Sequence, residues 1–586
     1  MGDKGIMIID GIPVEIGDEK NLLELIREIG IELPTFCYHS ELSIHGACRM
    51  CMVEDKRGGI VAACSEQPRN GMEIRTNTER LRQYRKNILE LLLANHCRDC
   101  TTCFKSGDCK LQELALRYNI SNIRFANTAL NLRPDNSSPC IGLERHKCIL
   151  CGDCVRMCNE IQRVGAIDFA WRGAKMSIST AFKTPIAKSA CVGCGQCASV
   201  CPTGAITIKN DTQRAFKALS DPDTLVTVQI APAVRVALGR AFGVPDGENA
   251  LGKIVAALRR IGFHEVYDTV TGADFTIMEE AAELLDRLER DRKGPMFTSC
   301  CPAWVNYCEK NYPEYLSSLS TARSPMQMLA SVVRERFRGE KRKTMHMAVM
   351  PCTAKKFEAA RPEFFRDGAP LVDIVLSTQG LIRMIRESGL IFSELEVEPI
   401  DSAFNVASGA GMIFGVTGGV TEAVLRRISD DKTPISLRRL AFSGVRGMRG
   451  VKEASVEAAG REVKIAVVSG LGNAADLIEK IQSGAAYYDF VEVMACPGGC
   501  VNGAGQPVAR SEAQSESRGN GLYAADRFCS YRRAEDNPLV AALYAGLLKG
   551  KTHELLHVKY ERGKTLAIAR GNADRSRPIL ERRDNG

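Results

Sequence analysis

Two short runs of β-branched and apolar residues, 6–9 and 12–16, open the chain on either side of Asp10-Gly11. That dipeptide favours a tight turn, so the pattern predicts a β-hairpin. Apolar residues at helical spacing then predict a helix that closes at Gly30. A loop with several cysteines follows, and together these elements predict a small α+β domain ending near residue 78.

A second helical pattern covers residues 79–96 and runs directly into His96. The apolar side chains expected on one side of it are Leu81, Tyr84, Ile88, Leu91 and Leu92. Residues 126–140 are polar, contain two prolines and are interpreted as a linker. Two similar cysteine-rich segments then fill residues 141–209 and indicate an internal duplication.

From about residue 210, strand-like runs alternate with helical stretches, which is typical of an α/β domain. The runs are TLVTVQIAP, HMAVM and KIAVVSG. The last of them leads into Leu471-Gly472, which lacks the third glycine of a dinucleotide-binding fingerprint and is interpreted as a plain βα turn. Beyond residue 510 the chain is polar and then helical near 537–557.

Composition places the chain among globular proteins, because 586 residues with 45% hydrophobic and 25% charged side chains suffice for several packed domains. The net charge of +8 counts every cysteine as neutral, and no basic and aromatic patch points to nucleic acid. No signal peptide and no run of about 18 apolar residues is present, so no membrane partner is expected. Seventeen of the 24 cysteines precede residue 202, which in a reducing, cytoplasmic setting indicates metal rather than disulfides.

Two full cysteine runs have the spacing of bacterial ferredoxins, in which the fourth cysteine crosses to the other cluster. This predicts two [4Fe–4S] clusters, and zinc sites with four cysteines are the alternative. The first ligand set is Cys148, Cys151, Cys154 and Cys201, and the second is Cys191, Cys194, Cys197 and Cys158.

Two further cysteine groups precede these runs. One stands where a plant-type [2Fe–2S] loop would sit, although its first gap is longer, and a zinc knuckle is the alternative. Its thiols are Cys37, Cys48, Cys51 and Cys64. The other group joins His96 to three thiols, with Cys97 as a rival ligand and a zinc site as the alternative. Those three thiols are Cys100, Cys103 and Cys109.

Three segments of the last domain contain the remaining chemistry: TSCCPAW at 298–304, MPCTAKKFE at 350–358 and EVMACPGGCVNGAGQP at 492–507. Four of their thiols could hold one cluster jointly, and the glycines of the third segment would let backbone approach inorganic ligands. The segments closely resemble the signature motifs of [FeFe]-hydrogenases, with Ala504 where that family usually has glycine. The order of the accessory groups resembles the large clostridial-type members and the catalytic subunits of NAD(P)-linked hydrogenases.

The resemblance implies an H-cluster, which is a [4Fe–4S] part joined to a diiron subsite with CO, cyanide and azadithiolate. Its thiols would be Cys301, Cys352, Cys496 and Cys500, the last bridging to the subsite. Lys355 would bind one cyanide, and Ser324 with the backbone near Ala231-Pro232 would contact the other. The side chains expected beside the diiron site are Met350, Met494 and, as a further candidate, Gln327.

The resemblance also implies a proton path from Cys300, which is not expected to bind iron. It would pass through Glu280, Ser320, Glu283 and Arg287 to solvent. The two glutamates and the arginine share one face of a helix expected to open at Asp274, whereas Glu279 faces elsewhere. From the residues alone, a solvated face with a Glu283–Arg287 ion pair is the alternative.

We therefore expect a multidomain α+β and α/β protein with one [2Fe–2S] cluster, three accessory [4Fe–4S] clusters and the H-cluster. The domains would be a β-grasp [2Fe–2S] ferredoxin-like domain at 1–78, a His-ligated [4Fe–4S] domain at 79–125, a 2[4Fe–4S] bacterial ferredoxin-like domain at 126–209 and an α/β H-cluster domain at 210–586. The end of the last domain, from about 510, would be small-subunit-like.

The function implied is the reversible interconversion of protons plus electrons and H2. Ferredoxin or NAD(P)H-oxidising partner subunits would exchange the electrons, and maturation proteins would supply the diiron site. A hydrogen sensor with low turnover is the alternative, against which Cys300 argues because sensory relatives tend to lose this thiol. An electron-transfer subunit like that of respiratory complex I, or an iron–sulfur assembly scaffold, fits only part of the motif set. The thiols left without a role are Cys97, Cys140, Cys308 and Cys529.

Overall fold

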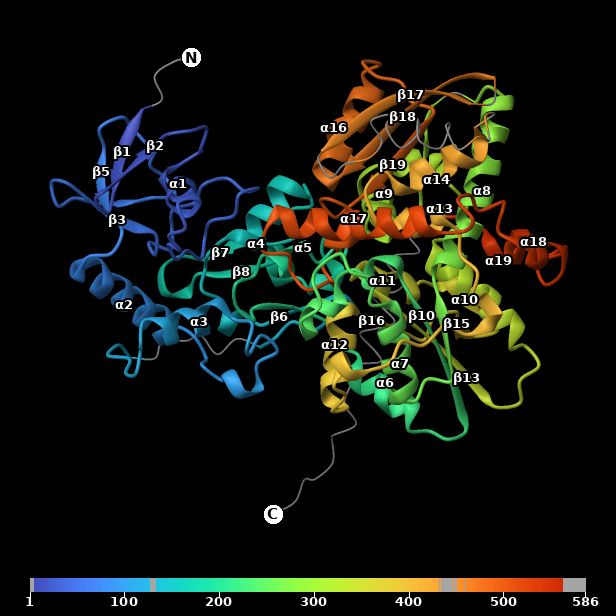
Figure 1. Cartoon of the computed structure of the whole chain (residues 1–586), viewed down its shortest axis with the longest axis horizontal. Coiled ribbons are helices and arrows are strands. Elements are labelled where there is room, and N and C mark those ends of the chain that lie inside the picture. Colours follow the sequence, from blue (N-terminus) through green and yellow to red (C-terminus); the bar gives the residue numbers. More distant parts are fainter. Residues whose placement is uncertain are drawn as a thin grey trace.

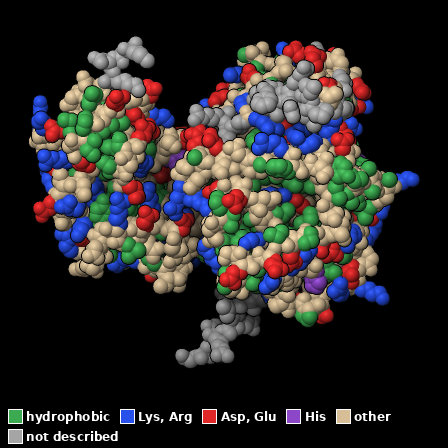
Figure 2. Space-filling model, in the orientation of Figure 1, with side chains coloured by type: hydrophobic (Ala, Val, Ile, Leu, Met, Phe, Trp, Pro, Cys, Tyr) green, Lys and Arg blue, Asp and Glu red, His purple; other side chains and the backbone are tan. Residues whose placement is uncertain are grey.

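A computed structural model describes residues 5–126, 133–292, 294–429, 431, 433, 446, 450–458 and 460–561. Figure 1 shows the sequence order reproduced in space, with the N-terminal domain at one end, the cysteine-rich modules in the middle and the largest domain at the other end. On the face in Figure 2, a notch separates the N-terminal lobe from the largest domain, and basic and acidic side chains are interspersed. Among the described residues, no helix is long and apolar enough to cross a membrane.

The N-terminal domain is a five-stranded mixed sheet of order β2-β1-β5-β3-β4 with one helix packed on it. The predicted hairpin and helix are confirmed, and the Asn21 side chain caps the helix by accepting from the Glu24 amide. The elements are β1 (Ile6–Ile9), β2 (Ile12–Glu15), α1 (Leu22–Glu28), β3 (Met52–Asp55), β4 (Ile60–Ala62) and β5 (Glu73–Arg75).

The second predicted helix is α2 (Glu79–Ala94), followed by α3 (Lys110–Arg117). Its expected apolar side is wrong at Leu91, which is 48% exposed. Arg85 is buried instead, because its guanidinium donates to the carbonyls of Met50, Met52 and Thr76 in the first domain. The buried face is therefore partly polar, which apolar periodicity could not indicate.

The segment interpreted as a linker falls partly outside the described residues, at 127–132. Its second half is packed rather than free: Asp135 bridges to Leu143 by paired backbone hydrogen bonds of 2.9 Å. The Asp135 carboxylate also accepts from the Ile186 amide at 2.9 Å. These residues thus belong to the module that follows.

The duplicated module folds around the antiparallel pair of β6 (Ile141–Leu143) and β9 (Ile206–Ile208). Each cysteine run enters a short helix, α4 (Asp153–Arg156) or α5 (Gln196–Ser199), and α4 continues into a wider turn at Met157–Ile161. Between the runs lies a second small hairpin, β7 (Asp168–Ala170) and β8 (Ser177–Ser179).

The largest domain contains two four-stranded sheets (Figure 1). One is entirely parallel, of order β11-β10-β13-β16, and every residue of its strand β10 is buried. Its strands are β10 (Thr224–Ile230), β11 (Glu265–Asp268), β13 (Lys343–Met350) and β16 (Ile374–Ser377). Its helices are α6 (Thr212–Leu219), α7 (Leu251–Ile261), α8 (Val270–Glu289), α10 (Pro325–Arg336), α11 (Ala354–Ala359) and α12 (Thr378–Glu387). The predicted α/β texture is confirmed, although α8 begins at Val270 rather than at Asp274.

The other sheet has the order β12-β19-β18-β17, with only the β17–β18 pair antiparallel. Its strands are β12 (Met296–Phe297), β17 (Val451–Ala458), β18 (Arg461–Ser469) and β19 (Phe490–Met494). The associated helices are α9 (Pro302–Asn311), α13 (Gly409–Met412), α14 (Gly419–Ile428) and α16 (Leu471–Gln482), and a small hairpin joins β14 (Phe365–Arg366) to β15 (Ala369–Pro370). The turn between β18 and α16 is the plain βα turn predicted from the sequence.

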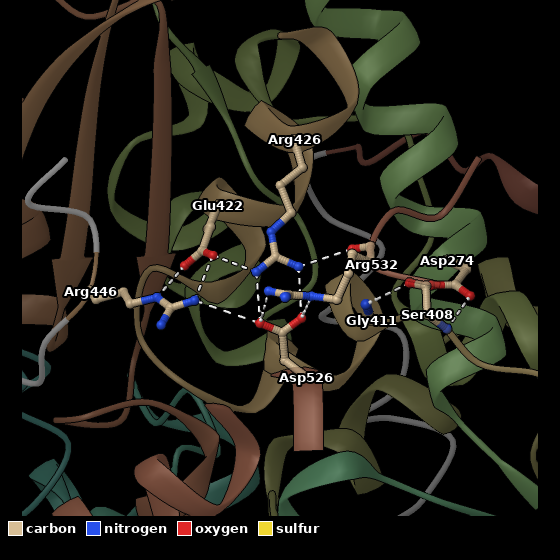
Figure 3. A network of polar contacts seen from close by, with 8 residues as sticks. All are labelled: Asp274, Ser408, Gly411, Glu422, Arg426, Arg446, Asp526 and Arg532. Carbon is tan, nitrogen blue, oxygen red and sulfur yellow. Dashed lines mark hydrogen bonds and ion pairs between the residues drawn. The ribbon is translucent and has the colours of Figure 1, made fainter. Parts of the chain in front are cut away.

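The C-terminal region contains α17 (Glu512–Phe528), α18 (Pro538–Ala545) and α19 (Thr552–Leu556). Helix α17 corrects the expectation of a merely polar stretch after residue 510. A buried ion network fastens it to α14 (Figure 3): Arg426 donates to both carboxylate oxygens of Asp526 at 2.8–2.9 Å and to Glu422. Arg446 and Arg532 complete the charge balance. The tail is therefore integral to the domain.

Candidate active site and cluster sites

The thiols of the expected catalytic cluster follow the carboxyl ends of strands from both sheets. Cys301 comes shortly after β12, Cys352 after β13 and Cys496 after β19. Ligands of α/β folds bind in this position, where the ends of parallel strands open a crevice. The sequence segments that carry the chemistry are thus brought together by the topology.

Cys500 joins these three thiols. Burial raises the pKa of the Cys496 thiol well above its ordinary value, and Cys352, Cys500 and Cys301 raise it further. Burial likewise raises the pKa of Cys352 to about 12, with Cys301 adding to it. Bare thiolates would repel one another in this shielded place, whereas iron binds and neutralises them.

Lys355 lies at the edge of this group. Its ammonium donates to the Cys300 carbonyl at 3.1 Å and to Glu358 at 2.9 Å, and the side chain is buried. Although burial opposes its charge, Glu358 and the cysteines raise the pKa of Lys355. A fixed cation beside the thiols suits an anionic ligand.

Two polar side chains here have no hydrogen-bond partner in the described structure. The Ser324 hydroxyl and both polar atoms of Gln327 are fully buried and unpartnered. Such groups are costly unless a ligand satisfies them, so both fit a polar group that binds beside the thiols. In contrast, the Ala231 amide already donates to the Val349 carbonyl at 3.0 Å and Pro232 has no N–H, so these two amides are not donors for a ligand.

The methionines occupy apolar surroundings. Met494 belongs to a buried cluster against which Cys300 and Cys500 pack. Met350 belongs to the main core, against which Cys301 and Cys352 pack. Both side chains therefore shield the thiols from water.

The glycines of the third segment have a different use from the one expected. A Cβ on Gly503 would lie 2.2 Å from the Pro351 carbonyl oxygen, and one on Gly505 would lie 2.8 Å from it. A Cβ on Gly499 would meet the Thr417 amide at 2.7 Å. These glycines allow one backbone to approach another, which fixes the loops that carry Cys352 and Cys500.

The expected proton-path residues lie in order on α8 and the loop beside it. Glu280 is fully buried, without a hydrogen-bond partner for either oxygen among the described residues. Burial, reinforced by Glu283, raises its pKa to about 8. Ser320 donates to Glu283 at 2.7 Å. Arg287, next along the face, donates to the Pro295 carbonyl at 3.2 Å and lines a surface cavity of about 230 Å³.

Cys300 faces the inner end of this row. Burial raises the pKa of the Cys300 thiol well above its ordinary value, and Glu280 adds to the effect. A neutral thiol and a neutral carboxyl at neutral pH are suited to passing protons on.

Sequence reasoning missed the partners of Glu283 on the tail side. His557 lies with Nδ1 3.6 Å from Glu283 and 2.7 Å from the Thr321 hydroxyl, and its Nε2 lies 2.9 Å from Glu279. Although burial opposes it, hydrogen bonds from His557, Thr321 and Ser320 hold the pKa of Glu283 below its usual range. No sequence pattern links residues so far apart.

A cavity of about 360 Å³ in the duplicated module is lined by Cys148, Cys151, Cys154 and Cys201. These are the four thiols grouped by the crossed ferredoxin spacing, and apolar residues form most of the remaining wall. The Leu150 amide donates to the Cys148 sulfur at 3.3 Å, as backbone does to cluster thiolates.

The other crossed set also converges. Burial, together with Cys194, Cys191 and Cys158, raises the pKa of the Cys197 thiol. Cys194 in turn lies close enough to Cys352 for that thiol to raise its pKa further. This set therefore adjoins the catalytic thiols.

The four thiols of the first domain pair closely. The Cys48 amide donates to the Cys37 sulfur at 3.3 Å, and the Phe36 amide donates to the Cys48 sulfur at 3.3 Å. A hydrogen bond from Cys51 raises the pKa of Cys64. Two close pairs of thiols suit a cluster of two irons, with one pair on each.

His96 lines a cavity of about 280 Å³ with Cys100, Cys103 and Cys109. Cys97 lines the same cavity, so the structure leaves it as a rival ligand. Burial lowers the pKa of His96 to about 4, and its Nε2 has no hydrogen-bond partner among the described residues. A neutral, unpartnered imidazole nitrogen is what a metal requires.

No three Cys, His, Asp or Glu side chains in the described ranges meet closely enough to hold a single metal ion. A cluster does not require such convergence, because each thiol binds a different iron. The cavities and thiol groups are compatible with clusters on these terms.

The cluster sites adjoin one another. Thr203 lines the Cys148 cavity and Gly204 lines the His96 cavity, so one short segment is the wall of both. Cys37 and Cys151 belong to one buried apolar cluster, which joins the first domain to the duplicated module. Both N-terminal sites therefore border the Cys148 site.

Family comparisons agree with these sites. The model described as iron only hydrogenase large subunit, C-terminal domain, matches residues 224–504, and that described as iron hydrogenase small subunit matches 513–562. The "NADP-reducing hydrogenase subunit HndD" of Solidesulfovibrio fructosivorans is 39% identical over 573 residues, covering 94% of this chain and 98% of the relative. The chain belongs to the iron-only hydrogenases.

Another member of this [FeFe]-hydrogenase family, "Iron hydrogenase 1" of Clostridium pasteurianum, is 34% identical over 95% of this chain and 100% of its own length. A solved apo structure of [FeFe]-hydrogenase HydA1 from Chlamydomonas reinhardtii is 38% identical, covers 61% of this chain and all of that one, and has a TM-score of 0.54. The accessory region matches a 2Fe-2S cluster binding domain at 6–79, an NADH-ubiquinone oxidoreductase-G iron-sulfur binding region at 85–124 and a 4Fe-4S dicluster domain at 147–205.

Proposed function

We propose a division of labour within this hydrogenase, which interconverts protons plus electrons and H2. The observation that carries the proposal is the arrangement of four buried thiols at the strand ends with Cys300 beside them and a buried acid behind it. It joins a metal site to a route for protons. The four expected domains, at 1–78, 79–125, 126–209 and 210–586, would each supply one part.

The catalytic cluster would be held by Cys301, Cys352, Cys496 and Cys500, with Cys500 at the diiron subsite. When bound, an H-cluster with CO, cyanide and azadithiolate supplies the redox chemistry on H2. The side chains then have separate tasks: Lys355 places a positive charge against one cyanide, and Ser324 and Gln327 offer unpartnered polar atoms for the other. Met350 and Met494 exclude water.

Protons would enter along α8. Glu283 receives them near the surface beside Arg287, Ser320 bridges inward through its 2.7 Å hydrogen bond, and Glu280 delivers them to the Cys300 thiol. The raised pKa of Glu280 keeps it protonated at neutral pH, which a relay in a dry interior requires.

Electrons would pass through one [2Fe–2S] cluster and three accessory [4Fe–4S] clusters. The thiols of the first domain and the His96 group would be entry points, and both border the Cys148 site. The Cys191 site then leads to the catalytic thiols. Several short steps of this kind suit transfer over a long molecule.

The electron partner is inferred from the relatives. The name of the Solidesulfovibrio relative, a subunit of an NADP-reducing hydrogenase, supports NAD(P)H-oxidising partner subunits in the cytoplasm for this chain, with ferredoxin as the other candidate. The match to an NADH-ubiquinone oxidoreductase iron–sulfur region at 85–124 supports the same class. Maturation proteins would install the diiron site.

Hydrogen evolution from reduced viologen by anaerobically matured protein tests this function, beside an infrared spectrum for CO and cyanide. We expect rapid evolution and both sets of bands, and Cys300→Ala should abolish most turnover while keeping the bands. Cys308→Ala is the control, because that buried thiol lies outside the site. Bands with negligible turnover in the unaltered protein would indicate a sensor, and the absence of bands would contradict the cluster assignment.

A further inference from the structure

The hairpin between the two cysteine runs presents an unusual surface. From Phe169 to Ala190 the chain has four basic residues and no acidic one. We name the 171–188 patch by its exposed side chains: Trp171, Arg172, Lys175, Phe182, Lys183 and Lys188. None of its four cations forms an ion pair with another described residue, so the positive charge is uncompensated.

Two aromatic side chains project from this basic surface. Phe182 is 101% exposed and Trp171 is 46% exposed, and the Lys183 ammonium lies 5.0 Å from the Trp171 ring centroid. A fully exposed phenyl ring costs hydration free energy that contact with a partner would recover. Interfaces are enriched in such aromatic residues.

The backbone beneath the patch is strained. Trp171, Phe182 and Lys183 have φ values of 64°, 54° and 58°, in the left-handed region that bulky residues rarely adopt. A hydrogen bond from the Thr180 hydroxyl to the Thr184 carbonyl closes the turn that holds Phe182 outward. Strain of this kind persists where a particular presentation of side chains has a use.

The patch is also directly connected to a cluster site. Strand β8 lies between its two halves, and Ile178 at the centre of β8 lines the cavity of Cys148, Cys151, Cys154 and Cys201. Arg145 fixes this strand by donating to the Ile178 carbonyl at 3.1 Å. A protein seated on the patch would thus be separated from that cluster site by little more than one strand.

We propose that the 171–188 patch docks a small acidic electron-carrier protein and gives its electrons direct entry at the Cys148 site. Charge complementarity selects the partner, because an unpaired basic surface attracts an acidic one and speeds encounter. Each carrier would give one electron, so two encounters would supply the two electrons that reduce two protons to H2. The proposal rests on the proposed function, and it adds an entry that bypasses both N-terminal sites.

The test uses the full-length matured enzyme with a reduced acidic 2[4Fe–4S] ferredoxin as the probe. Lys175→Glu with Lys183→Glu should lower the apparent second-order rate of ferredoxin-driven H2 evolution about tenfold at low salt, with the difference shrinking at high salt. Phe182→Ser should lower it at both salt concentrations. The viologen-driven rate should stay unchanged in both variants.

The matched control is Lys217→Glu with Lys341→Glu, which changes the same charge at exposed positions of the catalytic domain. Patch variants that behave like this control would overturn the proposal and assign ferredoxin entry to the N-terminal sites. A change in the molecular mass of the patch variants in solution would assign the patch to a second copy of the chain and would also overturn it. Failure of viologen to drive the unaltered enzyme would instead contradict the proposed function.

Discussion

The Nε2 atom of His557 lies 2.9 Å from Glu279 Oε2, and this contact joins the C-terminal tail to the helix that carries the expected proton path. The other nitrogen of the same ring faces Thr321 and Glu283. One imidazole therefore spans two carboxylates on α8, and its charge state bears on how the tail is held.

The docking of the tail should weaken at alkaline pH. Although burial opposes it, Glu279 and Glu283 raise the pKa of His557 to about 9 from 6.5. A raised histidine pKa stabilises the docked tail fully below about pH 6.5, and this stabilisation is lost as the pH rises through about 9. Tryptic cleavage in 551–559 should accelerate between about pH 7.5 and 9.5.

The comparison for that measurement is His557→Gln, which removes the titrating group. The ratio of cleavage rates between this variant and the unaltered protein cancels the pH dependence of trypsin. A ratio that does not change with pH would contradict a charged His557.

Replacing Glu280 should stop proton delivery without removing the metal site. Its pKa of about 8 keeps the carboxyl protonated below that pH, so hydrogen evolution should decline as the pH rises past about 8. Glu280→Gln should lower evolution by about 10²-fold or more, because a carboxamide cannot release and regain a proton. Glu280→Asp should recover part of the rate. Full activity of Glu280→Gln would exclude this carboxyl from the path.

His96→Ala should slow exchange with one redox partner while viologen-driven activity partly survives. The reason is that the His96 cavity lies at the edge of the relay rather than beside the catalytic thiols. Cys97→Ser is the control, and it should leave the electron paramagnetic resonance signal of this cluster unchanged if His96 is the ligand. Equal loss of both activities in His96→Ala would refute a peripheral role.

Gly195→Ala should impair electron transfer between the Cys191 site and the catalytic thiols. A Cβ there would lie 2.5 Å from Thr353 Oγ1 and 2.8 Å from Ala504 Cβ, so the two loops would have to separate. Stopped-flow reoxidation of the accessory clusters by protons should slow several-fold. Gly165→Ala shares the positive φ but meets nothing closer than 3.8 Å, and it should reduce this rate far less.

Arg426→Met should destabilise the domain strongly. The side chains of Arg426, Glu422 and Asp526 are fully buried, so removing the cation leaves two shielded carboxylates with fewer partners (Figure 3). Breaking a buried pair costs about 3–5 kcal/mol. The midpoint of anaerobic thermal unfolding should fall accordingly, whereas Arg427→Met, beside a looser 4.0 Å ion pair with Glu535, should change it little.

The sequence predicted what local patterns encode. The N-terminal hairpin depends on Asp10-Gly11, and the Cys148 cavity follows from a spacing that brings nearby thiols to one point. Helix α17 escaped prediction because its buried side chains include Ser515, Arg518 and Asp526, so its core-facing side is polar. Apolar periodicity detects only helices that bury apolar faces.

The contacts of the active site divide in the same way. Signature motifs led to the four catalytic thiols and to Lys355, whose neighbours lie close in sequence. The contact between His557 and Glu279 spans most of the catalytic domain, and neither residue stands in a motif. Tertiary packing alone brings them together, so only the structure could reveal them.

The wall formed by residues 202–205 makes the Cys148 site a common node for the two N-terminal entries. Currents that meet at a node add, so two electron donors supplied together should raise the rate by the sum of their separate contributions until the shared step saturates. Beyond that point, one donor can only displace the other. The reduction potential of a single cluster would then set the ceiling for both supplies, whichever partner is more abundant.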